Sequence, residues 1–565
     1  MANGFGSLYV GASGLQNSQN ALNTTANNLA NVNTVGYVRE QVRFSDKHYN
    51  LLKRTTARTN AQQYGLGVSV GDVVHARDVF LDKAFRQETG RASFYEARYT
   101  AVCEVEDMFQ ELDGEEFKNS VTDFYTAFQE LMKAPDDSTN QNLVVQKAEL
   151  FLTRSNSLYS DLQNYQSNLN KQIKDAVNEI NEIGNKIYQL NLDIQKVEVG
   201  GVETAMELRD QRDHMLDELA KYGAISTRED QSGFMFVDFE NQQFIDENTC
   251  YNIGIETAKG TGFVTPYWPQ LSNLQNNEYT QVFRIDVEIN TEYNNDIGKV
   301  KGLLLARGTG YGHYQDLADA DSFAKIDGCV VMETEAQLDQ LFHDIVTRIN
   351  NLLAPNKTLD TDLVVGGTTI PAGSKILDVE KCAYGTDGKL PPQELFSRIG
   401  CERYTKISAD GVDYYVYNQE NPADTSTQYI LGSVRTNPEL QKEVTRFPAF
   451  KKDGAVDFAL AEDLAAIWSD TCMTLNPNDT YPCNYTNYYD KMISKLATDG
   501  STYDSQQKTT ANTATSVDNQ RTQVTGVSSD EELTKMIKYQ SAYNASSRYI
   551  SVISEMTELI VTGLK

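Results

Sequence analysis

The sequence predicts an α+β multidomain protein: a discontinuous helical, coiled-coil frame, built from N- and C-terminal segments, that carries β-rich insertion domains. Three observations predict this class. Both ends of the chain show helical periodicity, long helical patterns recur between them, and two intervening stretches alternate apolar and polar residues as strands do. A length of 565 residues is enough for several cores.

The first 36 residues predict an amphipathic helix without charges. They contain no Asp, Glu, Lys or Arg but eight Asn, and leucines at 8, 15, 22 and 29 are spaced by seven. The intrinsic helix propensity of this segment is modest, so packing against other helices must supply most of its stability. It could be an ordinary core helix, but the absence of charge on every side favours burial among several helices.

The C-terminal segment predicts a second amphipathic helix. Ser529-Asp530-Glu531-Glu532 has the form of a capping box, with Ser529 accepting from the third helical amide and Glu532 reaching back. Apolar residues then recur at steps of three and four almost to Lys565. The two ends therefore look like coiled-coil partners. Because chain ends usually fray, such strong patterning indicates that they are used.

Between the ends, the longest helical pattern covers residues 156–199, about 40 residues. Gly200-Gly201 ends it, and Glu207–Leu219 resumes the helical period, which predicts a helical hairpin. Shorter helices are expected at 92–112, 116–133, 333–353 and 488–521. The strand-like alternation falls in 224–299 and 354–486, among turn residues.

These patterns divide the chain into four expected parts. A terminal coiled-coil region combines 1–65 with 527–565. A discontinuous helical domain combines 66–223, 300–353 and 487–526. A β-rich insertion occupies 224–299, and a β-rich outer insertion occupies 354–486.

Composition argues against several functions. Acidic residues outnumber basic ones by 79 to 50, and the formal charge of −29 repels phosphate backbones, so no nucleic acid is expected. Apolar runs are too short to span a bilayer, and the N-terminus has no apolar core of a cleaved signal, so neither membrane insertion nor a signal peptide is expected. Seven scattered cysteines without C-x-x-C argue against a disulfide framework or a zinc site.

No sequence pattern indicates an enzyme. The five histidines lie at least 27 positions apart, and phosphate-loop, dinucleotide and nucleophile-elbow motifs are missing. Asp316, Asp319 and Asp321 are the nearest approach to a cation cluster, but they lack the glycine and distal glutamate of a calcium loop. We therefore expect a solvated acidic loop there, and no catalytic, cofactor-binding or metal-binding residues.

Four passages resemble flagellar axial proteins. The segment 26–37, Ala-Asn-Asn-Leu-Ala-Asn-Val-Asn-Thr-Val-Gly-Tyr, closely resembles the N-terminal signature of rod, hook and hook-associated proteins, and Gly36 can supply a positive-φ turn after the helix. Residues 77–86, 208–213 and 527–565 resemble the FlgK family of hook-associated proteins, which form the first hook–filament junction. The β-rich stretches carry no recognised motif.

The resemblance implies a structural subunit that connects hook to filament and is needed for filament assembly, with paired terminal helices forming an inner tubular layer. Its partners would be copies of itself in a helical ring, the hook protein below and a second hook-associated junction protein of the FlgL type above. A head-to-tail assembly of this kind buries its terminal helices only once neighbours are present. The resemblance therefore implies that 1–65 with 527–565 is a polymerisation region that is disordered in the monomer. The expected assembly interface comprises Leu8, Leu15, Leu22, Leu29, Val32, Leu533, Ile537, Ile550 and Ile560.

The resemblance also implies export through the flagellar type III apparatus without a cleaved signal, and a final location in the extracellular flagellum. An export chaperone of the FlgN type would cover the C-terminal helix until assembly. Its expected contacts are Leu533, Met536, Ile537, Tyr543, Ile550 and Ile553.

Two alternatives stay open. A flagellar hook or distal rod protein has related terminal helices but is expected to lack the helix at 156–199 and the Arg-Asp-Gln-Arg-Asp return at 209–213. Outside the family, a coiled-coil adhesion or binding protein with β-rich display modules would keep ordered termini as an isolated soluble oligomer.

Overall fold

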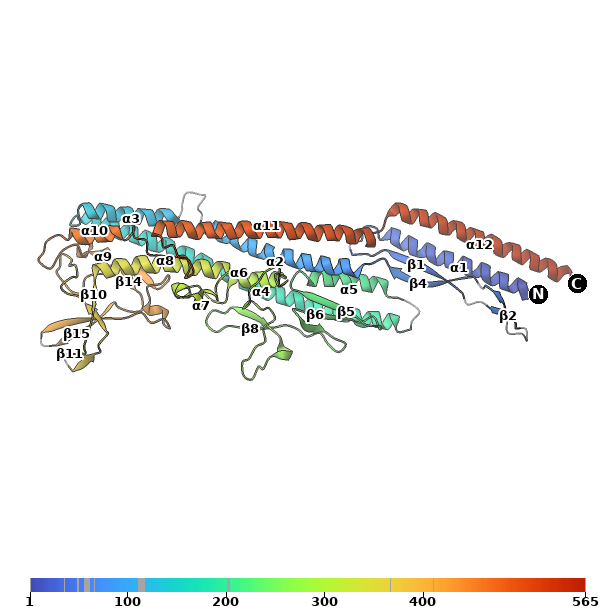
Figure 1. Cartoon of the computed structure of the whole chain (residues 1–565), viewed down its shortest axis with the longest axis horizontal. Coiled ribbons are helices and arrows are strands. Elements are labelled where there is room, and N and C mark those ends of the chain that lie inside the picture. The colour runs from blue at the N-terminus through green and yellow to red at the C-terminus, as the bar shows by residue number, and fades with distance from the viewer. Residues whose placement is uncertain are drawn as a thin grey trace.

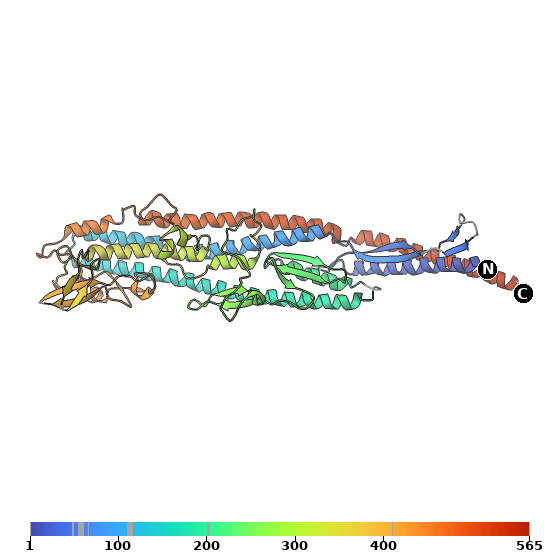
Figure 2. The same ribbon diagram turned by 60° about the horizontal axis from the view of Figure 1, so that its bottom comes forward.

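The computed structural model describes residues 2–34, 36–47, 50–54, 61–65, 67–109, 117–200, 204–365, 367–409 and 411–563. The molecule is a long rod in which the principal helices run along one axis, and both termini lie together at one end (Figure 1). Small sheets are attached along one side of the helices (Figures 1 and 2). The predicted mixed fold class, a helical frame with β-rich parts, is confirmed.

Long helices build the frame. They are α2 (Val79–Phe109), α3 (Phe117–Lys133), α4 (Ser138–Glu198), α5 (Met206–Leu219), α6 (Lys299–Arg307), α8 (Val330–Leu353) and α11 (Tyr485–Thr525). Helix α11 lies along α2, and α4 turns back into α5 as a hairpin. The short helix α7 (Ala320–Phe323) precedes α8. Among the described residues, no helix is both long enough and apolar enough to cross a membrane.

Helix α4 is longer than the pattern at 156–199 predicts. It begins at Ser138 and has 61 residues, which is about 92 Å at 1.5 Å per residue. The side chain of Asp137 accepts a hydrogen bond from the Thr139 amide and caps the true start. Helix α2 likewise begins at Val79, ahead of the expected residue 92.

One hydrophobic core runs through the frame and includes side chains from the segment 354–486. Phe124 of α3 stacks on Phe151 of α4, with ring centroids 5.6 Å apart. Phe396 and Trp468 meet the same Phe124 ring edge-on, at 6.0 and 5.5 Å. This segment is therefore packed into the frame as well as extending outward from it, and we expect its removal to open the core.

The strands pair into small antiparallel sheets. On the inner part of the rod, β5 (Ile225–Glu229), β6 (Met235–Phe239) and β7 (Gln242–Ile245) form one sheet, and β8 (Gly254–Thr257) pairs with β9 (Val264–Tyr267). Toward the outer end, the order is β10 (Asn356–Thr358), β13 (Lys375–Leu377), β16 (Val412–Tyr417), β15 (Tyr404–Ala409). Two further pairs are β11 (Leu363–Val365) with β12 (Thr368–Ile370), and β14 (Phe396–Arg398) with β17 (Val434–Thr436). Helices α9 (Pro438–Lys442) and α10 (Phe458–Ala466) follow.

The terminal module lies beyond the frame at the end that carries both termini. We use this name for α1 (Ala2–Ala30), α12 (Ser529–Gly563) and the strands β1 (Glu40–Asp46), β2 (Asn50–Arg54), β3 (Ala61–Tyr64) and β4 (Val68–His75). β1 pairs with β4 and β2 with β3, so the chain between α1 and α2 is a long antiparallel ribbon. Gly36 has a φ of +82°, as expected for the turn that follows α1.

Candidate assembly interface

Helices α1 and α12 form a close antiparallel pair. A side-chain carbon added at Gly11 would lie 2.7 Å from Cγ1 of Ile550, and one added at Gly14 would lie 2.8 Å from Oγ of Ser546. The contact positions rise along α1 as they fall along α12, which fixes the antiparallel direction. Glycine at these positions therefore lets the two helix backbones approach closely.

Small and polar residues, rather than the heptad leucines, form the most buried face of α1. Leu8, Leu15, Leu22, Leu29 and Val32 are all half-buried. Gly11, Ser18, Ala21, Thr25 and Asn28 are buried at helical spacing, and Ser13 and Asn17 are buried beside them. These mostly small residues recur at steps of three and four in the sequence. This spacing could have predicted the buried face of α1, but the heptad of leucines is the more conspicuous pattern.

Helix α1 is covered on two sides, whereas α12 is covered on one. On one side α1 packs on α12, and on another it contacts β1 and β4 of the ribbon. The side-chain amide of Asn17 donates to the Val68 carbonyl and ties α1 to β4. Helix α12 has α1 as its principal neighbour among the described elements. The apolar residues of α12 are therefore divided between a covered face and an open one.

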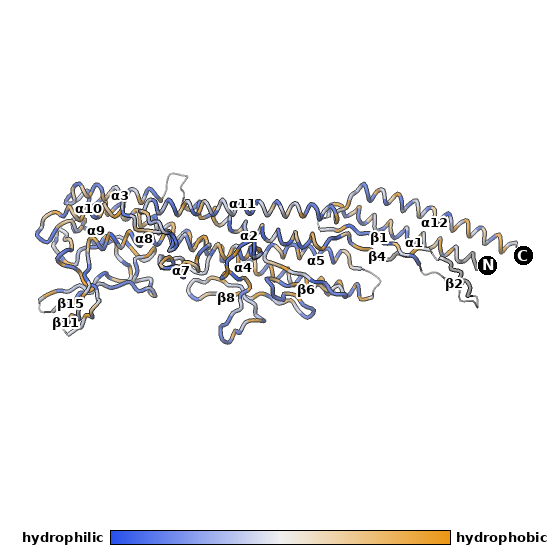
Figure 3. Tube along the Cα trace, in the orientation of Figure 1, coloured by the Kyte–Doolittle hydropathy of each residue, from blue (hydrophilic) through white to orange (hydrophobic). Residues whose placement is uncertain are grey.

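The outer face of α12 exposes large apolar side chains along its length. This face comprises Leu533, Ile537, Val552, Met556, Leu559 and Ile560, which are between 45% and 72% exposed. Figure 3 shows apolar positions continuing toward the C-terminal end of α12. Because a monomer rarely exposes so long an apolar face, this surface has the character of an interaction site.

The residues expected at the C-terminal interface lie on both faces of α12. Ile550 is half-buried against α1, whereas Leu533, Ile537 and Ile560 belong to the outer face. The residues expected to bind a chaperone divide in the same way. Met536, Tyr543, Ile550 and Ile553 are half-buried, and Leu533 and Ile537 are open. A partner that touches all six must therefore displace α1, and this contact stays a prediction.

The capping box at the start of α12 is shifted by one residue from its expected position. Ser529 is already helical, and Oγ of Ser528 faces the Glu531 amide at 3.5 Å. Glu532 does not reach back to cap the helix. It is 1% exposed, accepts from the Asn28 side chain at 3.2 Å and pairs with Lys535 at 2.6 Å. Two neighbouring serines made the capping position ambiguous in the sequence.

Asn28 joins α1, the ribbon and α12. Its amide nitrogen donates to the Glu40 carbonyl at 2.9 Å and to the Glu532 carboxylate at 3.2 Å. Its side-chain oxygen accepts from the Tyr37 hydroxyl at 2.8 Å and from the Glu40 amide at 2.9 Å. Burial, followed by the nearby Glu40, raises the pKa of Tyr37, which keeps this hydroxyl a donor. The amide-rich signature at 26–37 therefore sets the geometry of the module through a buried asparagine.

The Arg-Asp-Gln-Arg-Asp motif of α5 is the joint between the terminal module and the frame. Its acidic residues, one helical turn apart, face the terminal segments. Asp210 accepts from the Val38 amide at 2.8 Å and lies 3.4 Å from Nε2 of His75. Asp213 binds Arg77 and lies 3.5 Å from Arg86. Residues far apart in sequence therefore meet on one face of a short helix.

Asp217, one turn further along α5, extends this joint to α11. Its carboxylate binds Arg86 at 2.7 Å and Arg521 at 2.6 Å. Arg39, between α1 and β1, contacts the end of α11 and the start of α12. Its amide donates to the Thr525 carbonyl at 2.8 Å, and its guanidinium pairs with Glu531 at 3.1 Å. The chain crosses between module and frame twice, after His75 and after Thr525. These contacts hold both crossings and the turn at Val38 and Arg39.

Burial perturbs the charges at the joint. It raises the pKa of Asp210 to about 7 and lowers the pKa of His75 to about 4. Both shifts favour the neutral form of each side chain, as expected for groups removed from water. A protonated Asp210 beside a neutral His75 is consistent with the 3.4 Å separation, which is long for an ion pair.

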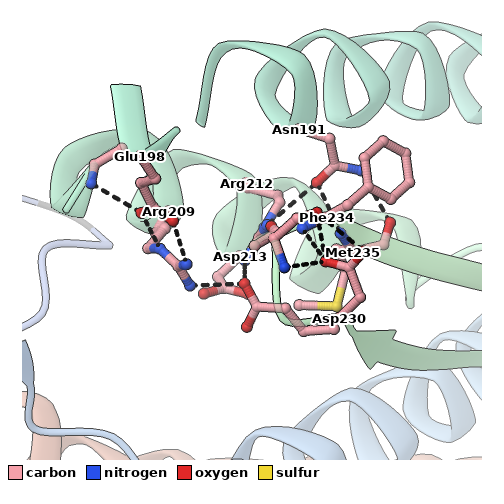
Figure 4. A network of polar contacts seen from close by, with 12 residues as sticks. Asn191, Glu198, Arg209, Arg212, Asp213, Asp230, Phe234 and Met235 are labelled. Carbon is pink, nitrogen blue, oxygen red and sulfur yellow. Dashed lines mark hydrogen bonds and ion pairs between the residues drawn. The ribbon is translucent and has the colours of Figure 1, made fainter. Parts of the chain in front are cut away.

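The basic residues of the same motif face the inner β-rich part (Figure 4). Arg212 is 1% exposed and donates to the Gly233 carbonyl at 2.7 Å and to Oδ1 of Asn191 at 3.2 Å. Arg209 holds both oxygens of Glu198 at 2.8 Å and also Glu229 at 2.7 Å. The motif thus binds the strand hairpin on one side and the terminal segments on the other.

The acidic loop serves as helix caps. Asp316 accepts from the His313 amide at 2.9 Å, and Asp319 caps α7 by accepting from the Ser322 amide at 2.8 Å. In the part of the chain that the structure describes, no cluster of three His, Cys, Asp or Glu is arranged to hold a metal ion.

Three family models match the chain. "Flagellar hook-associated protein FlgK helical domain" covers residues 102–367, "Flagella basal body rod protein" covers 8–37, and "Flagellar basal body rod FlgEFG protein C-terminal" covers 519–562. The last two coincide with the paired terminal helices, and the first with most of the frame and the inner sheets.

Relatives support the same assignment over the whole length. Flagellar hook-associated protein 1 of Bacillus subtilis is 23% identical, over 100% of this chain and 99% of the relative. The protein of the same name from Salmonella typhimurium is 27% identical, over 37% of this chain and 36% of the relative. The flagellar hook junction protein FlgK of Burkholderia pseudomallei shares the fold, with a TM-score of 0.50 at 12% identity, over 78% of this chain and 98% of that one. The helical-domain model, the full-length relative and the shared fold agree, so the chain is similar along its length to the FlgK family of flagellar hook-associated proteins.

Proposed function

We propose that this chain is a structural subunit of the bacterial flagellum that connects the hook to the filament and is needed for filament assembly. The observation that carries the proposal is the terminal module, where α12 packs on α1 with one face and exposes six large apolar side chains on the other. An exposed apolar face of this kind on an elongated subunit is suited to contact with neighbouring copies in a helical ring.

The frame supports a mechanical role. Helix α4 alone is about 92 Å long, α3, α6 and α8 pack against it, and α11 lies along α2 in the same continuous core. Ion pairs of the joint, Arg77 with Asp213 and Arg521 with Asp217, hold the rod at the two places where the chain crosses to the terminal module. A rod that is stiff along its axis and anchored at one end suits a subunit that passes torque from hook to filament.

The partners follow from the same surfaces. The hook protein would lie below the ring and a second hook-associated protein of the FlgL type above it, with the outer face of α12 against neighbouring copies. Before assembly, an export chaperone of the FlgN type would cover α12 while the chain is held for the type III apparatus. Binding of this chaperone to Tyr543, Ile550 and Ile553 requires α1 to leave α12, which favours a terminal module that opens readily.

The hook and distal rod alternative shares the terminal helices only. A flagellar hook protein of Borreliella burgdorferi is 40% identical to this chain but over just 15% of it. The FlgK helical-domain model matches 102–367, outside the two terminal segments that the rod-protein models match. A hook–filament junction role therefore accounts for more of the chain.

Deletion of the gene in its own bacterium tests the proposal. We expect complete hooks without filaments, flagellin monomers in the medium, and restoration by the wild-type gene. Antibody against this chain should label the hook–filament boundary. Shortened or missing hooks would indicate a hook or rod protein instead, and unchanged filaments would contradict any junction role.

A further inference from the structure

Two adjacent apolar side chains protrude at the start of α2. Val79 is 79% exposed and Phe80 is 76% exposed. The Phe80 amide donates to Oδ1 of Asp78 at 2.9 Å, which caps the first turn of the helix. One and a half turns later, the ring of Phe85 is covered by the guanidinium of Arg521 at 4.0 Å.

A groove with an apolar floor lies between α4 and α5. Its volume is about 500 Å³, and Leu190 and Met215 supply the apolar surface. Gln189, Gln211, Lys186 and Asp193 are among its polar lining residues. Met215 also packs against the main core, so the floor of the groove is held in place.

The protrusion and the groove lie at the same level of the rod. Val79 and Phe80 stand next to Asp82, which binds Arg77, and Arg77 binds Asp213 on α5. The groove is lined by residues 211, 214 and 215 of that same helix. Because Val79 and Phe80 are more than three quarters exposed, they are not bound in the groove of their own chain.

A protruding apolar pair and a separate apolar groove on one chain are the two complementary surfaces that a head-to-tail contact between copies requires. Charges favour the same match. Exposed Asp78 and Lys83 flank the protrusion, and Lys186 and Asp193 flank the groove, so each side offers one charge of each sign. Asp193 already pairs with Lys196 at 2.7 Å, but this pair is largely exposed and can exchange partners at little cost.

We propose that Val79 and Phe80 of one copy insert into the groove between α4 and α5 of a neighbouring copy. This contact rests on the proposed function, because it requires copies of the chain to be arranged side by side at the junction. It would join the frames of adjacent subunits at the level of the joint, separately from contacts made by the terminal helices.

Cysteine cross-linking in assembled flagella tests the contact. Phe80→Cys and Gln189→Cys, combined in a Cys472→Ser background to remove the exposed native thiol, should give a ladder of disulfide-linked multimers after mild oxidation of isolated hook–filament complexes. Each single variant should give none. As a matched control, Phe458 is also an exposed phenylalanine, 55% exposed on α10, so Phe458→Cys with Gln189→Cys should stay monomeric.

A second measurement uses assembly itself. Phe80→Ser should raise the flagellin shed into the medium several-fold, while Phe458→Ser should leave it unchanged. If the double-cysteine chain is found at the junction by antibody labelling but stays monomeric, the groove contact is refuted and the junction role stands. If wild-type chain is absent from the junction, the proposed function and this contact fail together.

Discussion

Arg212 is the most consequential single side chain of the joint, and its removal gives a quantitative test. In Arg212→Ala, the buried Gly233 carbonyl loses its 2.7 Å donor, which costs about 1–3 kcal/mol. Loss of a fully buried long side chain adds a cavity cost of about 2 kcal/mol. Glu229 keeps Arg209 at 2.7 Å and is 33% exposed, so no charge is stranded. The expected total is about 3–5 kcal/mol.

Amide hydrogen exchange localises this loss. Because about 1.4 kcal/mol corresponds to a tenfold change in an equilibrium constant, exchange in strand β6 should accelerate at least about a hundredfold in Arg212→Ala. Exchange in α11 should change little, since the hairpin detaches locally. Arg228→Ala is the matched control, because Arg228 is exposed and its guanidinium only rests 4.4 Å from the Phe236 ring. If both variants behave alike, the assigned role of Arg212 is wrong.

Three other predictions concern the terminal module and its joint. Leu22→Asp places a charge in a half-buried seam and should abolish filament formation, while the circular dichroism of the frame is retained; normal motility would disprove the seam. Gly11→Leu should also block assembly although it raises helix propensity by about 1 kcal/mol, because its side chain meets Ile550 at 2.7 Å; a fully assembling variant would contradict the close pairing. The pKa of Asp210 is raised, so its contribution to the stability of the joint falls as the pH rises from about 4 to about 7. The pKa of His75 is lowered, so its contribution to stability increases as the pH rises from about 4 to about 6.5. His75→Gln removes the histidine effect and leaves that of Asp210, so amide exchange protection at the joint should decline as the pH rises from about 4 to about 7. Protection that rises with pH in this variant would contradict the assignment.

Helical periodicity predicted most of the frame but misplaced where helices begin. Residues 138–155 contain Val144, Ala148 and Phe151 at helical spacing, all buried against the core, but the predicted helix begins only at residue 156. The actual limits are set by the Asp137 cap and the preceding Pro135. Cap residues, rather than the apolar pattern, decide such boundaries.

The parts of the interface that escaped prediction depend on tertiary contacts. Phe396 and Trp468 lie in a strand-rich stretch, and nothing in their local sequence indicates that both reach the Phe124 ring. Asp210 and Val38 are 172 positions apart. The motifs at 26–37, 77–86 and 208–213 were each visible in the sequence, but their convergence on one joint follows only from the fold.

The face of α1 illustrates a different limit. The leucine heptad predicts a packing seam, and this stays a prediction for assembly, whereas the closest approach of α1 to α12 uses Gly11 and Gly14. A seam of small residues carries little hydrophobic signal, since glycine and serine contribute almost nothing to an apolar pattern. Disorder of the terminal module in the free chain stays a prediction, and the single covered side of α12 is its physical reason.

Electron cryomicroscopy of the hook–filament junction in intact flagella tests the central claim most directly. Copies of this chain should form a helical ring between hook and filament, with Leu533, Ile537, Leu559 and Ile560 of α12 covered by neighbouring subunits. A junction without this chain, or one in which these four side chains still face solvent, would contradict the account.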